Sequence, residues 1–215
     1  MKDLMDELGL VDRSVAEGTV PAGPAQVVTL SRRYAATRIE LWDALTDPDR
    51  LARWFLPVEG ALSLGGRYAF TGNAGGVVRA CEPPHRLLVT WEMGPTGPQD
   101  ASLVEVLLEE APGAPGGTLL TLSHRAQTPP DMWDQFGPGA VGVGWDGALL
   151  GLSLYLADAP LPSTEELDRD PAVREFNAAA ARAWGEAQLA AGTDPAVVEA
   201  NVAATTAFYV PPQAD

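Results

Sequence analysis

Apolar and polar side chains alternate with a period of two residues along the middle of the chain. Segments with this alternation occur at 27–34, 67–71, 77–81, 86–93, 102–109 and 118–125. Such alternation is typical of strands with one buried face. Because only short stretches rich in Gly and Pro separate the segments from 67 to 125, we expect these to pair as an antiparallel meander.

Two short helices are predicted between the first two of these segments. Thr37 and Glu40 have the spacing of a capping box, in which both side chains bind backbone N–H groups of the first turn. Asp47-Pro48 begins a second helix, with the proline in the first turn, where its missing N–H does no harm. The first helix is expected to bury its apolar residues Ile39, Leu41, Trp42 and Leu45.

A long segment at 142–157 follows the strands and is apolar almost all round. From Ala148 to Ala157 only Ser153 and Tyr155 carry a polar side-chain atom. A helix without a wide polar face must be covered on more than one side. The run is shorter than the roughly 18 apolar residues that a membrane span requires. We therefore expect a core helix and no contact with a membrane.

The two ends of the chain differ from this middle part. Residues 1–24 combine a short helical pattern with a Pro/Gly-rich stretch at 21–24, which is typical of an arm followed by a linker. The apolar residues of the helical pattern are Leu4, Leu8 and Val11. We predict three parts, an N-terminal arm at 1–24, a main domain at 25–160 and a helical extension at 161–215.

The extension is predicted to be an acidic α-helical hairpin. Ala-rich helical patterns cover 172–190 and 196–208. Asp170 and Asp194 each precede a proline, which is the order of an N-cap and a first-turn proline. Ser163–Glu166 has the spacing of a further capping box. The hairpin is expected to cover the long helix or to form a homodimer through the C-terminal helices.

Composition and charge limit the function. The formal net charge is −15 and the isoelectric point is near 4.4, whereas non-specific binding of nucleic acid needs basic residues on the phosphates. Cys81 is the single cysteine, so no internal disulfide can form. Met1–Gly9 is acidic and lacks the basic start of a signal peptide. We expect a cytoplasmic protein without a nucleic-acid or membrane partner.

A series of spaced motifs runs over residues 26–158. In chain order they are Tyr34-Ala-Ala-Thr37, Leu41-Trp42, Thr46-Asp47-Pro48, Arg53-Trp54-Phe55, Leu64-Gly65-Gly66, Glu82-Pro-Pro-His-Arg-Leu87, Thr90-Trp91, Gly117-Thr118-Leu-Leu-Thr-Leu122, His124 and Gly144-Trp145. Together they resemble the START-like (SRPBCC) superfamily, and within it the Hsp90-ATPase-activator homology family. The resemblance implies an α+β helix-grip fold, in which a curved antiparallel sheet wraps round a long C-terminal helix and encloses a cavity, here with the helical hairpin appended.

Residues that would line such a cavity follow from the resemblance and from the alternation. They are Tyr68, Phe70, Trp91, Val106, Leu122, His124, Trp133, Phe136 and Trp145. His124 shares a strand face with Leu120 and Leu122. It either contacts a ligand as donor or general base, or is held by hydrogen bonds within the protein. The aromatic rings either stack on an apolar ligand or fill the core.

The sequence gives little support for a cofactor or a metal. Gly142–Gly147 spells G-x-G-x-x-G, but no strand precedes it and no parallel strand follows, and nucleotide binding needs both. These glycines are expected instead to let the helix start approach the sheet closely. Two histidines and one cysteine without compact spacing predict no metal site. No serine lies on a Gly-flanked elbow, as a hydrolase triad requires.

Three classes of function are therefore open. The first is binding of a small hydrophobic, aromatic or lipid-like molecule between the sheet and the long helix. The second is a cyclase or dehydratase in the same cavity, with His124 moving a proton. The third is an interaction protein, either co-chaperone-like or homodimeric. The fold alone does not choose between them.

Overall fold

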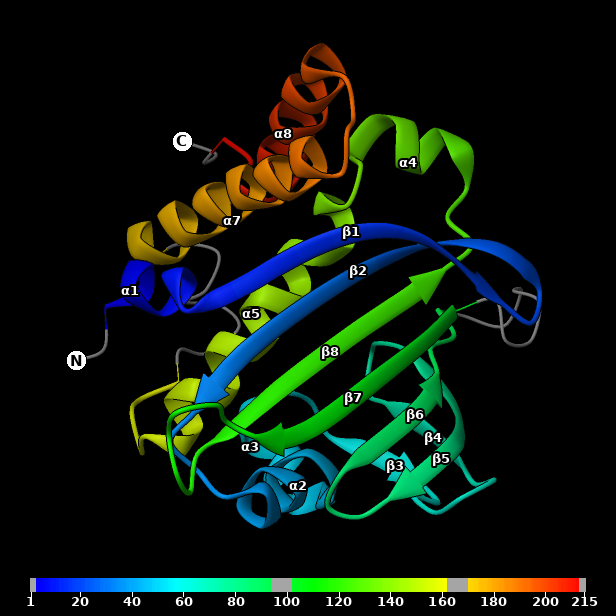
Figure 1. Cartoon of the computed structure of the whole chain (residues 1–215), viewed down its shortest axis with the longest axis vertical. Coiled ribbons are helices and arrows are strands. Elements are labelled where there is room, and N and C mark those ends of the chain that lie inside the picture. The colour runs from blue at the N-terminus through cyan, green and yellow to red at the C-terminus, as the bar shows by residue number, and fades with distance from the viewer. Residues whose placement is uncertain (1–2, 94–101, 162–169, 213–215) are drawn as a thin grey trace. The chain divides into compact units, whose positions relative to one another are not determined.

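The structure is a computed structural model that describes residues 3–93, 102–161 and 170–212. Its contacts divide the chain into two compact units, which Figure 1 shows in colours that follow the sequence. We call Glu17–Gln127 the sheet unit, and Met1–Ala16 together with Thr128–Asp215 the helical unit. The domain boundaries expected near residues 24 and 160 stay predictions. The predicted capping box Ser163–Glu166 lies outside the described residues.

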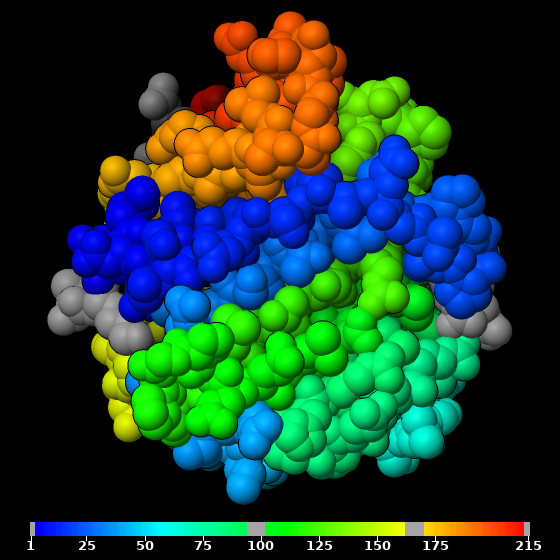
Figure 2. All heavy atoms as spheres, in the orientation of Figure 1, coloured from blue at the N-terminus to red at the C-terminus, as the bar shows by residue number. Residues whose placement is uncertain are grey.

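Among the described residues, one sheet of eight strands has the order β1-β2-β8-β7-β6-β5-β4-β3. The strands are β1 (Val11–Val20), β2 (Gly23–Tyr34), β3 (Val58–Gly60), β4 (Arg67–Phe70), β5 (Gly75–Glu82), β6 (Arg86–Thr90), β7 (Ser102–Glu110) and β8 (Thr118–Ala126). From β2 to β3, neighbouring strands pair antiparallel and form a curved sheet (Figure 1). The space-filling view shows β7 and β8, in green, directly beside β5 and β6, in teal (Figure 2). The predicted α+β fold class with a curved antiparallel sheet is confirmed.

The alternation places His124 as the sequence predicted. Along β8, Leu120, Leu122 and His124 are buried, whereas Ser123 and Arg125 are half-buried on the other face. His124 lies opposite Val104 of β7 and Val28 of β2, and both of these are buried. We call the face that carries His124 the inner face of the sheet, and the face that carries Ser123 the outer face.

The prediction for the N-terminal arm is wrong in its second half. Residues 11–20 form an edge strand of the sheet, and residues 21–22 form the turn to β2 rather than a linker. Gly23 has a φ of +134°, a conformation that favours glycine. Val11 and Val20, at the two ends of β1, are its buried residues, so an alternating pattern was missing. Strand β3 at Val58–Gly60 was likewise not predicted, because it is only three residues long.

The two short helices form as predicted, as α2 (Arg38–Thr46) and α3 (Pro48–Trp54). Thr37 Oγ1 accepts the N–H of Glu40 at 3.3 Å, and the Asp47 side chain caps α3. Ile39, however, is 66% exposed, so its predicted burial is wrong. With 3.6 residues per turn, the face formed by the buried residues Leu41, Trp42 and Ala44 points away from position 39.

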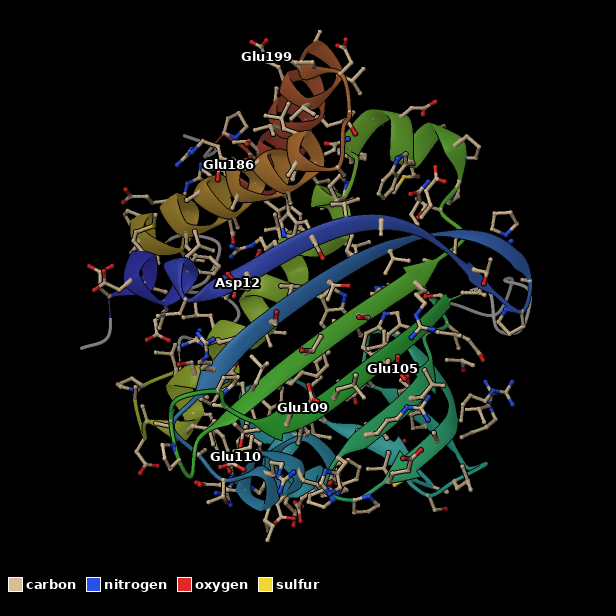
Figure 3. All side chains as sticks on the ribbon, in the orientation of Figure 1. Asp12, Glu105, Glu109, Glu110, Glu186 and Glu199 are labelled. Atoms are coloured by element: carbon tan, nitrogen blue, oxygen red, sulfur yellow. The ribbon has the colours of Figure 1, made fainter. Side chains whose placement is uncertain are left out.

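The helical unit contains α1 (Leu4–Gly9), α4 (Pro130–Phe136), α5 (Gly139–Leu156), α7 (Pro171–Ala190) and α8 (Pro195–Tyr209). The predicted hairpin is confirmed, and Asp170 and Asp194 cap its helices. Acidic side chains such as Glu186 on α7 and Glu199 on α8 are exposed (Figure 3). Helix α4 was not predicted, since the prolines and glycines around it suggested a loop.

The hairpin packs on the long helix α5 in the way that the apolar pattern required. A Cβ on Gly142 would come within 2.1 Å of the Trp184 ring, and Trp184 is fully buried. A Cβ on Gly139 would come within 2.6 Å of Thr205 Oγ1. The glycine at position 142 therefore makes room for α7, and the expectation that it serves approach to the sheet is wrong. The G-x-G-x-x-G sequence lies inside a helix that follows another helix, so it forms no phosphate-binding turn.

Helix α8 also fixes the junction between α4 and α5. Three polar side chains, four residues apart and hence on one face of α8, donate to backbone carbonyls of this junction. The bonds are Asn201 Nδ2 to Asp134 O (2.7 Å), Thr205 Oγ1 to Phe136 O (3.1 Å) and Tyr209 OH to Ala140 O (2.7 Å). The hairpin thereby satisfies two carbonyl groups at the C-terminal end of α4, where a helix leaves carbonyls without partners, and also binds a carbonyl in the first turn of α5.

Buried polar groups tie the N-terminal segment to α5. Arg13 binds the carboxylate of Asp146, with Nη2 2.7 Å from Oδ1, and the Asp146 side chain is fully buried. Trp184 Nε1 donates to the same carboxylate at 2.8 Å. Burial raises the pKa of Asp146, and the bonds from Arg13 and Trp184 oppose that rise. Ser153, about two turns after Asp146 in α5, donates a hydrogen bond to Glu7 of α1.

Among the described residues, α5 is the one helix long and apolar enough to cross a membrane, with a mean hydropathy of 1.2 over 18 residues. A core helix meets the same criterion. Helices α1, α7 and α8 pack on α5, and its Asp146 forms a buried ion pair with Arg13. Such contacts are typical of a core helix, which is what the apolar pattern of the sequence predicted.

Candidate functional site

A continuous row of rings crosses the sheet unit. Its members, which we call the aromatic row, are Trp54, Phe55, Phe70, Tyr68, Trp91 and His124. Ring centroids are 5.0 Å apart for Phe55 and Phe70, 5.7 Å for Phe70 and Trp91, and 6.4 Å for Trp91 and His124. These spacings are within the range of favourable aromatic contacts. Tyr68 and Phe70 share a face of β4 because they are two positions apart along the strand.

His124 forms a hydrogen bond with Ser102 at the end of the row. Ser102 Oγ lies 2.6 Å from His124 Nε2. Ser102 begins β7, and its carbonyl accepts the N–H of Trp91 at 2.9 Å, which holds the serine beside the row. His124 is 7% exposed, whereas Ser102 is half-buried. Of the two roles predicted for His124, a hydrogen bond within the protein is confirmed, and contact with a ligand stays a prediction.

The histidine is neutral under physiological conditions. Burial lowers the pKa of His124 from 6.5 to about 4, because a charged imidazolium would lose its hydration there. A neutral imidazole has one N–H and one lone pair. A base with so low a pKa takes up a proton only weakly at neutral pH. The Ser102–His124 pair is therefore an uncharged hydrogen-bonding group.

Tyr68 offers its ring rather than its hydroxyl. The phenol donates to the carbonyl oxygen of Thr90 at 2.7 Å. Burial, and secondarily the charge of Glu92, raises the pKa of Tyr68, so the phenol stays protonated. Since its hydrogen is used by the backbone, Tyr68 is fixed in orientation, with its ring against Phe70. The glycine at 76, whose Cβ would meet the same carbonyl at 2.1 Å, allows this close packing.

The ion pairs around Glu105 lie on the outer face. The Glu105 carboxylate accepts bonds from Arg86 Nε, at 2.7 Å, and from Arg125. Arg86 also binds Glu82 at 2.9 Å. Glu105 lies on β7 (Figure 3), with Arg86 on the neighbouring strand β6 and Arg125 on β8. It is opposite Ser123, so it is on the other face from His124. The inner face around His124 is thus separated from these charges.

The structure places the predicted cavity residues in both units. Tyr68, Phe70, Trp91 and His124 are joined by ring contacts, and Val106 lies opposite Leu122 with both side chains buried. Trp133, Phe136 and Trp145 belong to the helical unit. Trp133 and Phe136 are half-buried on α4, and the Phe136 ring lies 5.8 Å from Phe208 of α8. Trp145 is buried on α5.

Two polar residues of the inner face were missed in the sequence. Ser102 shares a face with Val104, so alternation could have found it. Arg32 follows Leu30 on the inner face of β2 and is 3% exposed, with its guanidinium carbon 4.9 Å from the centre of the Tyr34 ring. Its signal was a charge at a position where alternation demands an apolar residue.

Among the described residues, no group of three or more His, Cys, Asp or Glu side chains is arranged to hold a metal ion. The two histidines do not contribute to one site. His85 lies in an exposed turn beside Arg38, whereas His124 is buried next to Ser102. The predicted absence of a cofactor stays a prediction.

Comparison of the chain with known proteins identifies its family. Residues 35–157 match the family described as activator of Hsp90 ATPase homolog 1-like protein. The solution structure of CalU16 from Micromonospora echinospora is 34% identical, with a TM-score of 0.69, over 85% of this chain and 97% of that chain. DynU16, a protein of the dynemicin biosynthetic locus, is 27% identical, with a TM-score of 0.51, over 61% and 47% of the two chains.

An Hsp90 activator from Plasmodium falciparum, PFC0360w, is 21% identical, with a TM-score of 0.52, over 62% of this chain and 97% of that chain, which shows a shared fold alone. No protein of curated function matches significantly. The family match covers most of the sheet unit together with α4 and α5, in the element order of the helix-grip fold. The chain belongs to the activator of Hsp90 ATPase homolog 1-like family.

Proposed function

We propose that the sheet unit binds a small aromatic or apolar molecule against the aromatic row. The observation that carries this proposal is the continuous contact of five aromatic rings and one imidazole on one unit. Phe55, Phe70 and Trp91 are only half-buried, so these residues keep part of their surface exposed. Flat rings with a few polar groups beside them are the usual lining of a site for an aromatic ligand.

The neighbours support a small-molecule role more than a co-chaperone role. DynU16 is a protein of the dynemicin biosynthetic locus and is 27% identical to this chain. The Hsp90 activator is 21% identical, a level at which only the fold is carried over. The family name alone does not assign a chaperone partner.

Binding is better supported than catalysis by a cyclase or dehydratase. Such an enzyme needs a base whose pKa is near the working pH. The pKa of His124, lowered to about 4, makes the ring a poor proton acceptor. Its hydrogen bond with Ser102 suits recognition of a polar ligand group instead. A homodimer through the C-terminal helices stays a prediction, as does the cytoplasmic location.

Equilibrium dialysis of the full chain against naphthalene tests the proposal, with native mass spectrometry of the purified protein to detect any co-purified ligand. Trp91→Ala removes a ring from the middle of the row, and we expect affinity to fall about ten-fold, the worth of one good stacking contact. Phe208→Ala is the matched control, because Phe208 is an exposed aromatic residue of the helical unit. Absence of binding to the wild-type chain, or an equal loss in both variants, contradicts the proposal.

A further inference from the structure

The polar group at the end of the aromatic row limits the kind of ligand that fits. Ser102 is half-buried and lies between Trp91, to which its backbone is hydrogen-bonded, and His124, to which its hydroxyl is bonded. A ligand stacked on Trp91 would therefore have Ser102 Oγ at its edge. What this oxygen can bind depends on the direction of its bond with His124.

Counting hydrogens and lone pairs shows what Ser102 retains. A serine hydroxyl has one hydrogen and two lone pairs, and a neutral imidazole has one N–H and one lone pair. If Nε2 donates to Oγ, Ser102 keeps its hydrogen and one lone pair. If Oγ donates to Nε2, Ser102 keeps two lone pairs. Oγ thus retains an acceptor site in both arrangements, while its hydrogen remains in only one of them.

The charged side chains of the sheet unit further limit which ligand groups Ser102 can bind. Glu105 and its arginine partners lie on the outer face, so none of them neutralises an ion beside His124. Arg32 is on the inner face, but it lies four residues along β2 from Val28, the partner of His124, which is about 13 Å at ~3.3 Å per residue. Within the described part of the chain, neither Glu105 with its arginine partners nor Arg32 would compensate for the hydration that a carboxylate or ammonium group loses at Ser102.

We infer that Ser102, held by His124, binds an uncharged hydroxyl group on an otherwise aromatic ligand, so that the ligand is a phenol or an aromatic alcohol. A ligand hydroxyl donates to Oγ in either arrangement of the serine–histidine bond. A ketone or an ether accepts only, and so depends on the one arrangement that leaves the serine hydrogen available. This inference rests on the proposed function, since it places the ligand on the aromatic row.

The test compares four ligands of one ring system by equilibrium dialysis at neutral pH. They are 2-naphthol, 2-methoxynaphthalene, 2-methylnaphthalene and 2-naphthoate. We expect 2-naphthol to bind about five-fold more tightly than 2-methylnaphthalene, which is the worth of one neutral hydrogen bond. The ether should bind like the hydrocarbon or at most two- to three-fold better. The carboxylate should bind more weakly than the hydrocarbon.

Three variants test whether Ser102 causes the preference for 2-naphthol. Ser102→Ala removes the hydroxyl and should reduce the affinity for 2-naphthol to that for 2-methylnaphthalene, while leaving the latter unchanged. Ser123→Ala is the control, because Ser123 lies on the outer face, where it bonds to Thr29 Oγ1 at 3.1 Å. Ser102→Thr keeps a hydroxyl and should keep part of the preference. The thermal unfolding temperature of each variant shows whether it is folded.

The outcomes separate this inference from the proposed function. Equal affinity for all four ligands, or a 2-naphthol preference that persists in Ser102→Ala, overturns the inference and leaves binding on the aromatic row intact. Tightest binding of 2-naphthoate also overturns it, because the site would then prefer a charged group to an uncharged hydroxyl. No binding of any ligand overturns the proposed function, and the inference with it.

Discussion

Acidification should destabilise the sheet unit through His124. Burial lowers the pKa of this histidine from 6.5 to about 4, so the unfolded chain takes up the proton at a higher pH than the folded chain. The folded state therefore loses stability as the pH falls below 6.5, and the loss is complete once the pH is below 4. The total is about 3 kcal/mol, at ~1.4 kcal/mol for each tenfold difference in proton affinity.

The effect is measurable well above the pH at which the carboxylates dominate. Linkage gives a loss of about 2 kcal/mol between about pH 7 and about pH 5. Urea denaturation, followed by tryptophan fluorescence and far-UV circular dichroism, gives the free energy of unfolding at each pH. In His124→Gln this contribution is absent, whereas all other titrating groups are retained. The difference in unfolding free energy between wild type and variant should therefore shrink by about 2 kcal/mol over this range.

His85→Gln is the matched control, because it removes the other imidazole of the sheet unit, whose ring is exposed rather than buried. A difference between wild type and His124→Gln that does not change with pH would refute the reasoning, since it would mean that the folded state accepts the proton as readily as the unfolded chain. A similar pH-dependent difference for His85→Gln would show that burial of the ring is not the cause.

Two further predictions concern the helical unit, and urea denaturation checks both. Gly142→Ala should destabilise by about 1–3 kcal/mol, because its Cβ would come within 2.1 Å of Trp184, whereas Gly147→Ala, with no atom within 4 Å, should stabilise by about 0.5–1 kcal/mol through helix propensity. Equal effects would contradict the packing of α5 on α7. Arg13→Leu should cost about 3–5 kcal/mol by leaving Asp146 buried without its partner, and Asp146→Leu in the same chain should restore part of this loss. A single variant as stable as the parent would contradict the role of the pair.

The features that could be predicted from the sequence are those with a local physical cause. The alternation of β8 fixed which side of the strand His124 occupies, because side chains point to opposite faces in turn. Thr37, Asp47 and Asp194 began helices where predicted, since each caps N–H groups within three residues of itself. Such signals need no knowledge of the rest of the chain.

The features that escaped prediction depend on contacts between distant positions. Ser102 and His124 are 22 residues apart, and their bond depends on the register of β7 against β8. β1 was missed because an edge strand buries few side chains, and here Val11 and Val20 alone are buried at its ends. Without register, the sequence identified the histidine and left its partner unknown.

Asp146 lies in the part of the chain that matches the family, but its partners come from the segments before and after that part. A carboxylate in an apolar helix is unstable unless a partner is buried with it. Its partners are Arg13 and Trp184, and both lie outside the family match at 35–157. The arm and the hairpin therefore supply the groups that keep this charge inside the helical unit. The likeness to CalU16, which covers 85% of the chain and so extends beyond the family segment, fits this dependence. A chain reduced to residues 35–157 would lose both partners of Asp146 together with the helices α1, α7 and α8 that pack on α5. For that reason α5 cannot be treated apart from the segments that flank the family domain.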